Sequence, residues 1–197
     1  MSKVKQLKSD VVKAITHFEE IAEYSSGKAY LARLRNSIGR PLSSSSDVMP
    51  IIFEKLSKDL IGNSSELNKE ELAFLTTLQL YALSKQGTST LFVDKELKNS
   101  NLGDSFGLLR LKDSGSKSVD RRFNALINAN EATDLLIHLR HMFKLLKSEK
   151  VTTHINYANL AADIYSFLLG YEENITIKWA RSYYNHNQKG EKENETK

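Results

Sequence analysis

The sequence predicts an all-α protein: a compact bundle of about eight to nine helices, which can divide into two sub-bundles. Apolar residues recur with three-four spacing through almost every segment, as on one face of a helix. Only two prolines occur in 197 residues, so long helices are rarely interrupted. With 40% hydrophobic and 26% charged residues, the composition is that of a soluble domain with a real core.

The N-terminal helical half covers residues 1–86. Its first helix has an apolar stripe at three-four spacing: Val4, Leu7, Val11, Ile15, Phe18 and Ala22. A second helix is expected over about 27–38, and Gly39 supplies its C-terminal stop with Pro41 beyond.

Two further helices complete this half. Asp47 can cap a helix that has Pro50 in its first turn. That helix turns three residues inward: Ile52, Leu56 and Leu60. Asn68 with Glu71 forms a variant of the capping box and predicts the start of the fourth helix.

Residues 87–99 are expected to be a connecting loop, with a short β-like patch at 90–93 that has nothing to pair with. The C-terminal helical half, 100–185, gives helices at about 101–112, 118–129, 131–148, 156–169 and 174–185. The polar, charge-balanced tail 186–197 has no core residue and is predicted to be disordered.

Basic residues gather in a first cluster near the second helix. The formal net charge of +4 and the pI of about 9.1 are modest, so placement matters more than size. No carboxylate lies within the segment that holds Lys28, Arg33, Arg35 and Arg40. Such a segment can be an exposed, solvated helix face or a contact for a polyanion, and both readings stay open.

A second cluster lies in the C-terminal half. It comprises Arg110, Arg121, Arg122, Arg140, Lys144 and Lys147. Cations in the last turns of a helix complement its dipole, but that does not explain why the last three share one edge. The loop 114–118 can approach a phosphate through its backbone N–H groups. Arginine suits phosphate because its fork donates two parallel hydrogen bonds.

Aromatic residues that would stack on bases are not evident. Tyr24, Tyr30, Tyr183 and Tyr184 are candidates, but tyrosines in helices are more often at the edge of a core.

No catalytic set is visible, so the protein is predicted not to be an enzyme and to need no cofactor or metal. His138, His141 and Asp134 have the spacing of a metal site, but no HExxH pattern and no fourth ligand accompany them. No glycine-rich phosphate loop and no nucleophile elbow are seen. The chain lacks cysteine and a signal peptide, and we expect it to be cytoplasmic.

Several motifs together resemble the CasB family, the small subunits of type I-E CRISPR Cascade surveillance complexes. The segment 27–35 followed by 39–41 resembles the N-terminal signature of that family. The segment 121–126 is similar to its central RF-x-x-L element, and 138–146 to its HLR…LL helix. Tyr157 to Leu160, with Trp179-Ala180 and the tyrosine pair 183–184, is similar to its C-terminal portion.

This resemblance implies an all-helical fold and two adjacent copies within each complex, between the crRNA-carrying backbone and the large subunit. It implies a role in stabilising the R-loop by holding target DNA and the displaced strand, while guide pairing selects the sequence. The implied partners are crRNA, both strands of target DNA, and the Cascade backbone and large subunits. The implied nucleic-acid contacts are the ten basic residues of the two clusters.

Two other classes of function remain as alternatives. One is a structural helical adaptor whose basic residues meet acidic protein partners without touching nucleic acid. The other is a small metal-dependent hydrolase acting on nucleotides.

Overall fold

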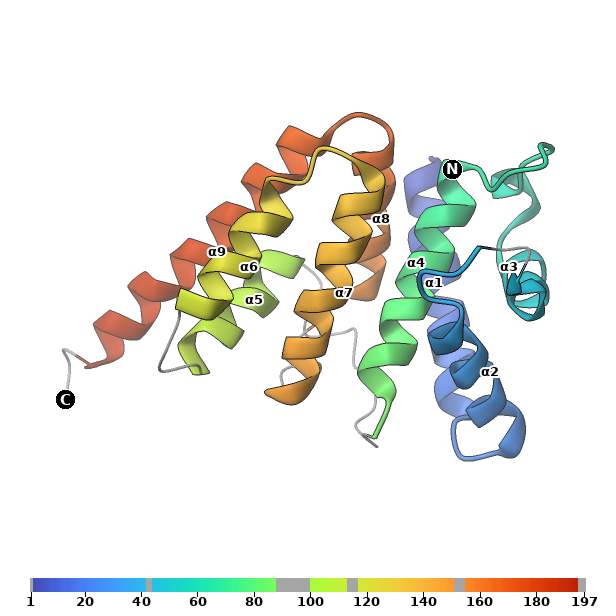
Figure 1. Ribbon diagram of the computed structural model, residues 1–197, viewed down its shortest axis with the longest axis horizontal. Helices are drawn as coiled ribbons and strands as arrows, with labels where there is room; N and C mark the ends of the chain where they lie inside the picture. Colours follow the sequence, from blue (N-terminus) through green and yellow to red (C-terminus); the bar gives the residue numbers. More distant parts are fainter. Residues whose placement is uncertain (1, 42–43, 88–99, 113–116, 151–154, 195–197) are drawn as a thin grey trace. The chain divides into compact units, whose positions relative to one another are not determined.

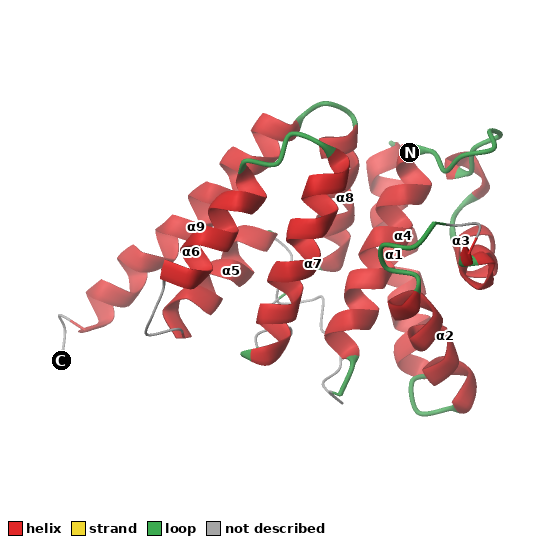
Figure 2. Cartoon of the chain, viewed as in Figure 1, coloured by secondary structure: helices red, strands yellow, loops and turns green. Residues whose placement is uncertain are grey.

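The computed structural model describes residues 2–41, 44–87, 100–112, 117–150 and 155–194, with side chains described up to residue 185. Every regular element in these ranges is helical, with no strand (Figures 1 and 2). The predicted all-α class is therefore confirmed, and nine α-helices are described. The predicted β-like patch at 90–93 lies outside the described residues.

The chain divides into two compact units, and each is made of helices that pack on one another. Unit 1 comprises Met1–Phe92 and Tyr157–Leu169, and unit 2 comprises Val93–Asn156 and Gly170–Lys197. Unit 1 holds five α-helices: α1 (Lys3–Glu20), α2 (Ser25–Asn36), α3 (Met49–Lys55), α4 (Lys69–Lys85) and α8 (Tyr157–Leu168). Unit 2 holds four: α5 (Leu102–Lys112), α6 (Lys117–Ile127), α7 (Ala132–Ser148) and α9 (Glu172–Asn194).

The units differ from the predicted halves in the position of α8. The predicted division assigns this helix to the C-terminal half, whereas in the structure it packs against α1 and α4. Its apolar face, with Leu160, Ala161 and Ile164 fully or almost fully buried, fits the core of unit 1. Hydrophobic periodicity shows that a helix has a buried face but not which partner covers it.

A buried carboxylate ties three helices of unit 1 together. The Glu70 Oε1 atom on α4 accepts hydrogen bonds from Lys3 Nζ on α1 at 2.6 Å and from the Tyr165 hydroxyl on α8 at 2.9 Å. Burial alone would raise the pKa of Glu70, but these bonds hold it below its ordinary value. Burial and the bond to Glu70 raise the pKa of Tyr165 to about 12.

The start of α4 agrees with the sequence prediction, whereas the end of α2 does not. The capping box is present, because the Glu71 N–H donates to Asn68 Oδ1 and the Asn68 N–H donates to Glu71 Oε2. Helix α2 ends earlier than predicted, at Asn36 with Ser37 as its C-cap, so Gly39, which has a left-handed φ of 73°, lies beyond the helix end and does not supply its stop.

The start of α3 corrects one prediction. Asp47 does not cap this helix; it lies in a 3-10 turn, and Val48 is the N-cap residue with no side-chain hydrogen bond. Leu60 lies beyond the end of α3, in the 3-10 turn Lys58–Leu60, although it is buried as predicted. A 3-10 turn can direct an apolar side chain inward as a continued α-helix would, so the apolar spacing alone does not distinguish a longer α3 from a separate 3-10 turn.

Close packing of α5 on α9 organises unit 2. A Cβ atom on Gly103 would lie 2.1 Å from the Trp179 carbonyl oxygen, so only glycine allows this approach. Just before α5, Asn101 Nδ2 donates to Ser182 Oγ of α9 at 2.6 Å. The Phe123 ring of α6 stacks on Tyr183 of α9 with ring centres 3.7 Å apart.

Helix α9 ends at Asn194, beyond the predicted end at residue 185, and residues 195–197 lie outside the described part of the chain. The backbone of 186–194 is therefore helical where disorder is predicted. This stretch has no proline, and its two lysines, two glutamates and one glutamine favour a helix, whereas Gly190 and its two asparagines do not.

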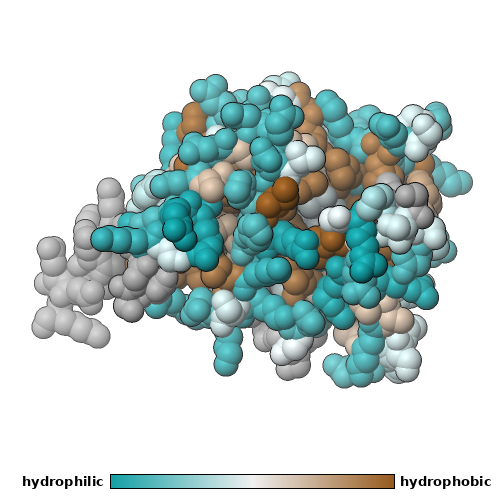
Figure 3. Space-filling model, viewed as in Figure 1, coloured by the Kyte–Doolittle hydropathy of each residue, from teal (hydrophilic) through white to brown (hydrophobic). Residues whose placement is uncertain are grey.

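Hydrophilic side chains predominate on the face seen in Figure 3, with smaller apolar patches between them. Within the described residues, no helix combines the length and the apolar character that a membrane span requires.

Candidate nucleic-acid interface

The first basic cluster lies on and just after α2. Leu31 and Leu34 turn inward, so Lys28 and Arg33 are exposed on the same helix. Arg40 is also exposed, in the bend that follows the helix.

Arg33 has a weak intramolecular partner. Its Nε atom lies 4.0 Å from Asp47 Oδ2, and the two side chains are 48% and 53% exposed. Its guanidinium also lies 5.8 Å from the centre of the Tyr30 ring. Exposed ion pairs are worth roughly 0–1 kcal/mol, so a phosphate can replace Asp47 at little cost.

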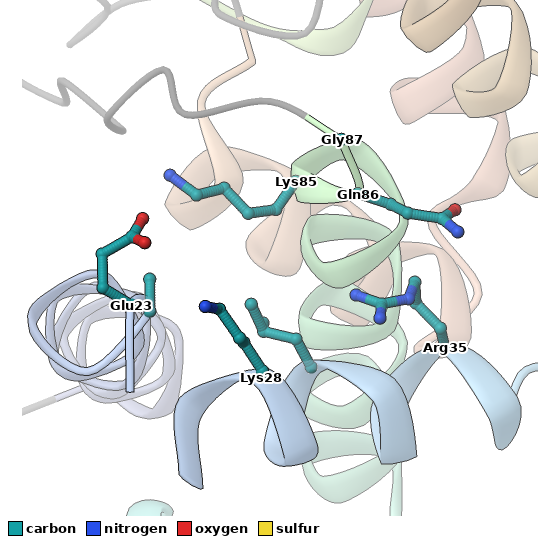
Figure 4. Close-up of a pocket in the computed structure, with 8 residues that line it drawn as sticks. Glu23, Lys28, Arg35, Lys85, Gln86 and Gly87 are labelled. Atoms are coloured by element: carbon teal, nitrogen blue, oxygen red, sulfur yellow. The ribbon is translucent and has the colours of Figure 1, made fainter. Parts of the chain in front are cut away.

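A hollow of about 350 Å³ lies beside this cluster, between α2 and the end of α4 (Figure 4). Lys28 and Arg35 extend from α2, and Lys85 and Gln86 come from the end of α4. The remaining lining residues are Ala22, Glu23, Leu31 and Gly87.

The cations of this hollow differ in how firmly they are held. Lys85 Nζ lies 2.5 Å from Glu19 Oε2, and the Tyr81 hydroxyl donates to the other oxygen of Glu19 at 2.6 Å. Arg35 Nη1 donates only to the Ala82 carbonyl, at 3.4 Å, and burial lowers the pKa of Arg35. Arg35 is thus a half-buried cation with no carboxylate partner in the described structure, and an anion in the hollow would compensate it.

In the second cluster, Arg110 already has partners within unit 2. Its Nε and Nη2 atoms donate to Asp120 Oδ1 and Oδ2 at 2.6 and 3.3 Å. The hydrogen bond to Asp120 raises the pKa of Arg110. Burial would raise the pKa of Asp120, but the bonds from Arg110 and Tyr183 hold it below its ordinary value. Arg110 therefore links α5 to α6 in this structure.

Three other cations of the second cluster are accessible. Arg121 and Lys144 are exposed and Arg140 is half-buried, and no hydrogen bond or ion pair engages their side chains in the described chain. Arg122 Nη1 instead donates to the carbonyl and hydroxyl of Ser118, one turn earlier on α6. Lys147 is half-buried and already engaged.

Part of the predicted phosphate loop falls outside the described residues. Residues 113–116 are not described, whereas Lys117 and Ser118 are exposed at the start of α6. The two basic clusters lie in different units, Lys28 to Arg40 in unit 1 and the others in unit 2.

The histidine pair of α7 stands apart from any ligand cluster. The His138 and His141 ring centres are 6.5 Å apart. In the described part of the chain, no group of three or more histidine, cysteine, aspartate or glutamate side chains could hold a metal ion.

Only Lys28 and Arg35 of the lining residues are among the predicted contacts, and two polar side chains at the end of α4 were missed. Lys85 is the last residue of α4, and Gln86 follows it. A cation at this position is already explained by the negative end of the helix dipole, so the sequence gives no separate sign of a binding role. The place of Lys85 and Gln86 beside Arg35 depends on how α2 packs on α4, and no local pattern reports that packing.

The fold and the surface together define a class: a small all-helical protein with accessible cations in two basic clusters. The sequence model of one family, described as CRISPR-associated protein Cse2, matches residues 30–184. Because this match spans most of the chain, the protein belongs to the Cse2 family. The predicted resemblance is confirmed, and membership supports a place as a subunit of a CRISPR Cascade complex.

A solved structure has the same fold. The crystal structure of CasB from Thermobifida fusca aligns with a TM-score of 0.68 at 18% identity, over 90% of this chain and 97% of that one. At this identity the likeness concerns the fold. A search of curated protein sequences finds no significant match.

Proposed function

We propose that this Cse2-family protein is a non-catalytic, cytoplasmic small subunit of a type I-E CRISPR surveillance complex that binds nucleic-acid backbone and stabilises the R-loop. Its partners are then crRNA, both strands of target DNA, the backbone and large subunits of Cascade, and a second copy of the chain. Guide pairing selects the sequence, so this subunit needs contacts to phosphates and not to base edges.

The observation that carries this proposal is the set of accessible cations on unit 2. Arg121, Arg140 and Lys144 have no carboxylate or other side-chain partner in the described residues, so a phosphate need not displace one. Each neutralised phosphate releases counterions, which makes binding fall as salt rises.

Charge reversal of these three residues in the assembled complex tests the proposal. The triple variant Arg121→Glu, Arg140→Glu, Lys144→Glu is expected to bind target DNA more weakly in an electrophoretic shift assay across salt concentrations. The slope of log affinity against log salt should become shallower by about 2 to 3, since three phosphate contacts are lost.

The matched control reverses three exposed lysines elsewhere. The variant Lys5→Glu, Lys13→Glu, Lys58→Glu changes the net charge equally, and all three residues are exposed in unit 1. It should bind with nearly the wild-type slope. If the two triple variants behave alike, the effect is one of net charge and the proposed interface is wrong.

The same assay separates the adaptor alternative. An adaptor would lose assembly with its protein partners when the three residues are reversed, and free nucleic acid would not compete for that surface. Intact assembly with weakened DNA binding supports the proposal instead.

A further inference from the structure

Tyr184 is an exposed ring that unit 2 holds in a fixed orientation. It lies on α9 and is 43% exposed. Its hydroxyl donates to Asn124 Oδ1 of α6 at 3.2 Å. Its ring meets Tyr183 and Phe123 edge to face, with centres 5.0 and 6.3 Å apart.

Arg110 fixes the ring further. Its guanidinium lies 5.8 Å from the centre of the Tyr184 ring and 5.7 Å from that of Tyr183. Asp120 holds Arg110 through two hydrogen bonds and also accepts from the Tyr183 hydroxyl at 2.5 Å. Three helices therefore position one solvent-facing aromatic side chain.

The other exposed tyrosines lack this support. Tyr24 and Tyr171 are 65% and 55% exposed, and no ring contact or side-chain hydrogen bond holds either of them in the described structure. Tyr183 is held in the same network but is fully buried. Tyr184 combines an open surface with a fixed ring, and a ligand that stacks on it need not order it first.

Exposed cations accompany the ring on two of the three helices that position it, α9 and α6. Arg181 is exposed one turn before Tyr184 on α9, and Arg121 is exposed one turn before Asn124 on α6. Asp120 is the only acidic residue of α6, and Arg110 neutralises it. Between residues 176 and 185, α9 contains no acidic residue. The surroundings favour a polyanion with a flat, stackable group.

We propose that Tyr184 stacks on an unpaired base of single-stranded nucleic acid, while Arg121 and Arg181 meet the flanking phosphates. Stacking on an aromatic side chain tolerates any base, because every base has a π-face. The inference rests on the proposed function, and it adds that the bound form is a strand with accessible bases.

Binding of the full-length chain to two labelled strands of equal length tests this inference by fluorescence anisotropy. One strand is oligodeoxythymidine, and the other carries abasic tetrahydrofuran sites in place of every base. The phosphates are the same, so the abasic strand measures backbone binding and the ratio of the two affinities measures stacking. Wild-type protein is expected to prefer the thymidine strand by roughly tenfold.

Three variants locate the preference. Tyr184→Ala should abolish it while binding to the abasic strand stays nearly unchanged. Tyr184→Phe keeps the ring, loses only the bond to Asn124, and should retain most of it. Tyr171→Ala removes a more exposed ring from unit 2 and should leave both affinities unchanged.

Each other outcome overturns the idea in an identifiable way. If Tyr184→Ala weakens binding to both strands by the same factor, the residue only supports the fold. Thermal unfolding followed by circular dichroism will then show a loss of stability. If wild-type protein binds both strands equally, the proposed function survives and the stacking role fails. If neither strand binds at low salt, both proposals fail.

Discussion

At the scale of single residues, the structure sorts the basic side chains by what already engages them. Arg110 is held by a carboxylate and two aromatic rings, whereas Arg121 is exposed without a partner in the described chain. A cation whose hydrogen bonds are satisfied inside the protein must break them before it binds phosphate. We therefore expect Arg110 to contribute to the stability of the fold and Arg121 to contribute to nucleic-acid binding.

Replacing Asp120 tests the structural role of this pair. Asp120→Asn removes the charge that Arg110 and Tyr183 bind, and it should lower the free energy of unfolding at pH 7 by about 2 kcal/mol. Because the pKa of folded Asp120 lies below its unfolded value, this contribution is complete above about pH 4 and is lost as pH falls toward the folded pKa.

The difference in unfolding free energy between wild type and Asp120→Asn should therefore shrink below about pH 4, as measured by urea denaturation at several pH values. Asp134→Asn is the control, because Asp134 is exposed and has no partner in the described chain. It should cost less than about 1 kcal/mol. A difference that stays constant down to pH 2 would contradict the assignment.

At the scale of elements, the helices position the candidate sites through their packing. The approach of α5 to α9 places Arg110 beside the tyrosine pair, and this approach depends on a position without a Cβ atom. The neighbour at Gly103 is backbone, the Trp179 carbonyl, and so cannot move aside as a side chain would.

Gly103→Ala should therefore destabilise unit 2 despite the better helix propensity of alanine. We expect a loss of about 2 kcal/mol or more in the free energy of unfolding, because overpacking typically costs 1–3 kcal/mol. The single tryptophan, Trp179, is fully buried at this contact, so its fluorescence reports the transition. Leu111→Ala, at an exposed position of the same helix, should change stability little; equal effects would refute the packing argument.

At the scale of the whole molecule, the chain crosses between its units more often than its sequence suggests. It leaves unit 1 after α4, forms α5, α6 and α7 in unit 2, returns as α8, and ends in unit 2 as α9. During synthesis, unit 1 therefore lacks part of its structure until the chain has reached residue 169.

Two truncations test this topology. A chain of residues 1–169 keeps every helix of unit 1, whereas a chain of residues 1–156 lacks α8 and exposes the apolar faces of α1 and α4. Amide hydrogen exchange should find α1 and α4 protected in the longer chain and largely unprotected in the shorter one. Equal protection in both would mean that α8 does not support unit 1.

The sequence alone predicted what depends on local pattern. Three-four spacing predicted the helices, and the Asn68–Glu71 box predicted the start of α4, because both follow from interactions within a few residues. The motifs that occur in succession between residues 27 and 184 also predicted the family. The apolar stripe of the last helix ends near residue 185, whereas the backbone of α9 continues to Asn194, and the sequence predicted Asp47 as a cap although Val48 is the N-cap of α3.

Only the tertiary structure decided which partner each face meets. In the structure, α8 packs within unit 1, and Lys85 and Arg35 line the same hollow. Arg110 forms an ion pair with Asp120. The structure also shows that Tyr184 is exposed whereas its neighbour Tyr183 is buried. Periodicity records that a face is covered but not by what, since burial is non-directional and depends on contacts between residues far apart in the chain.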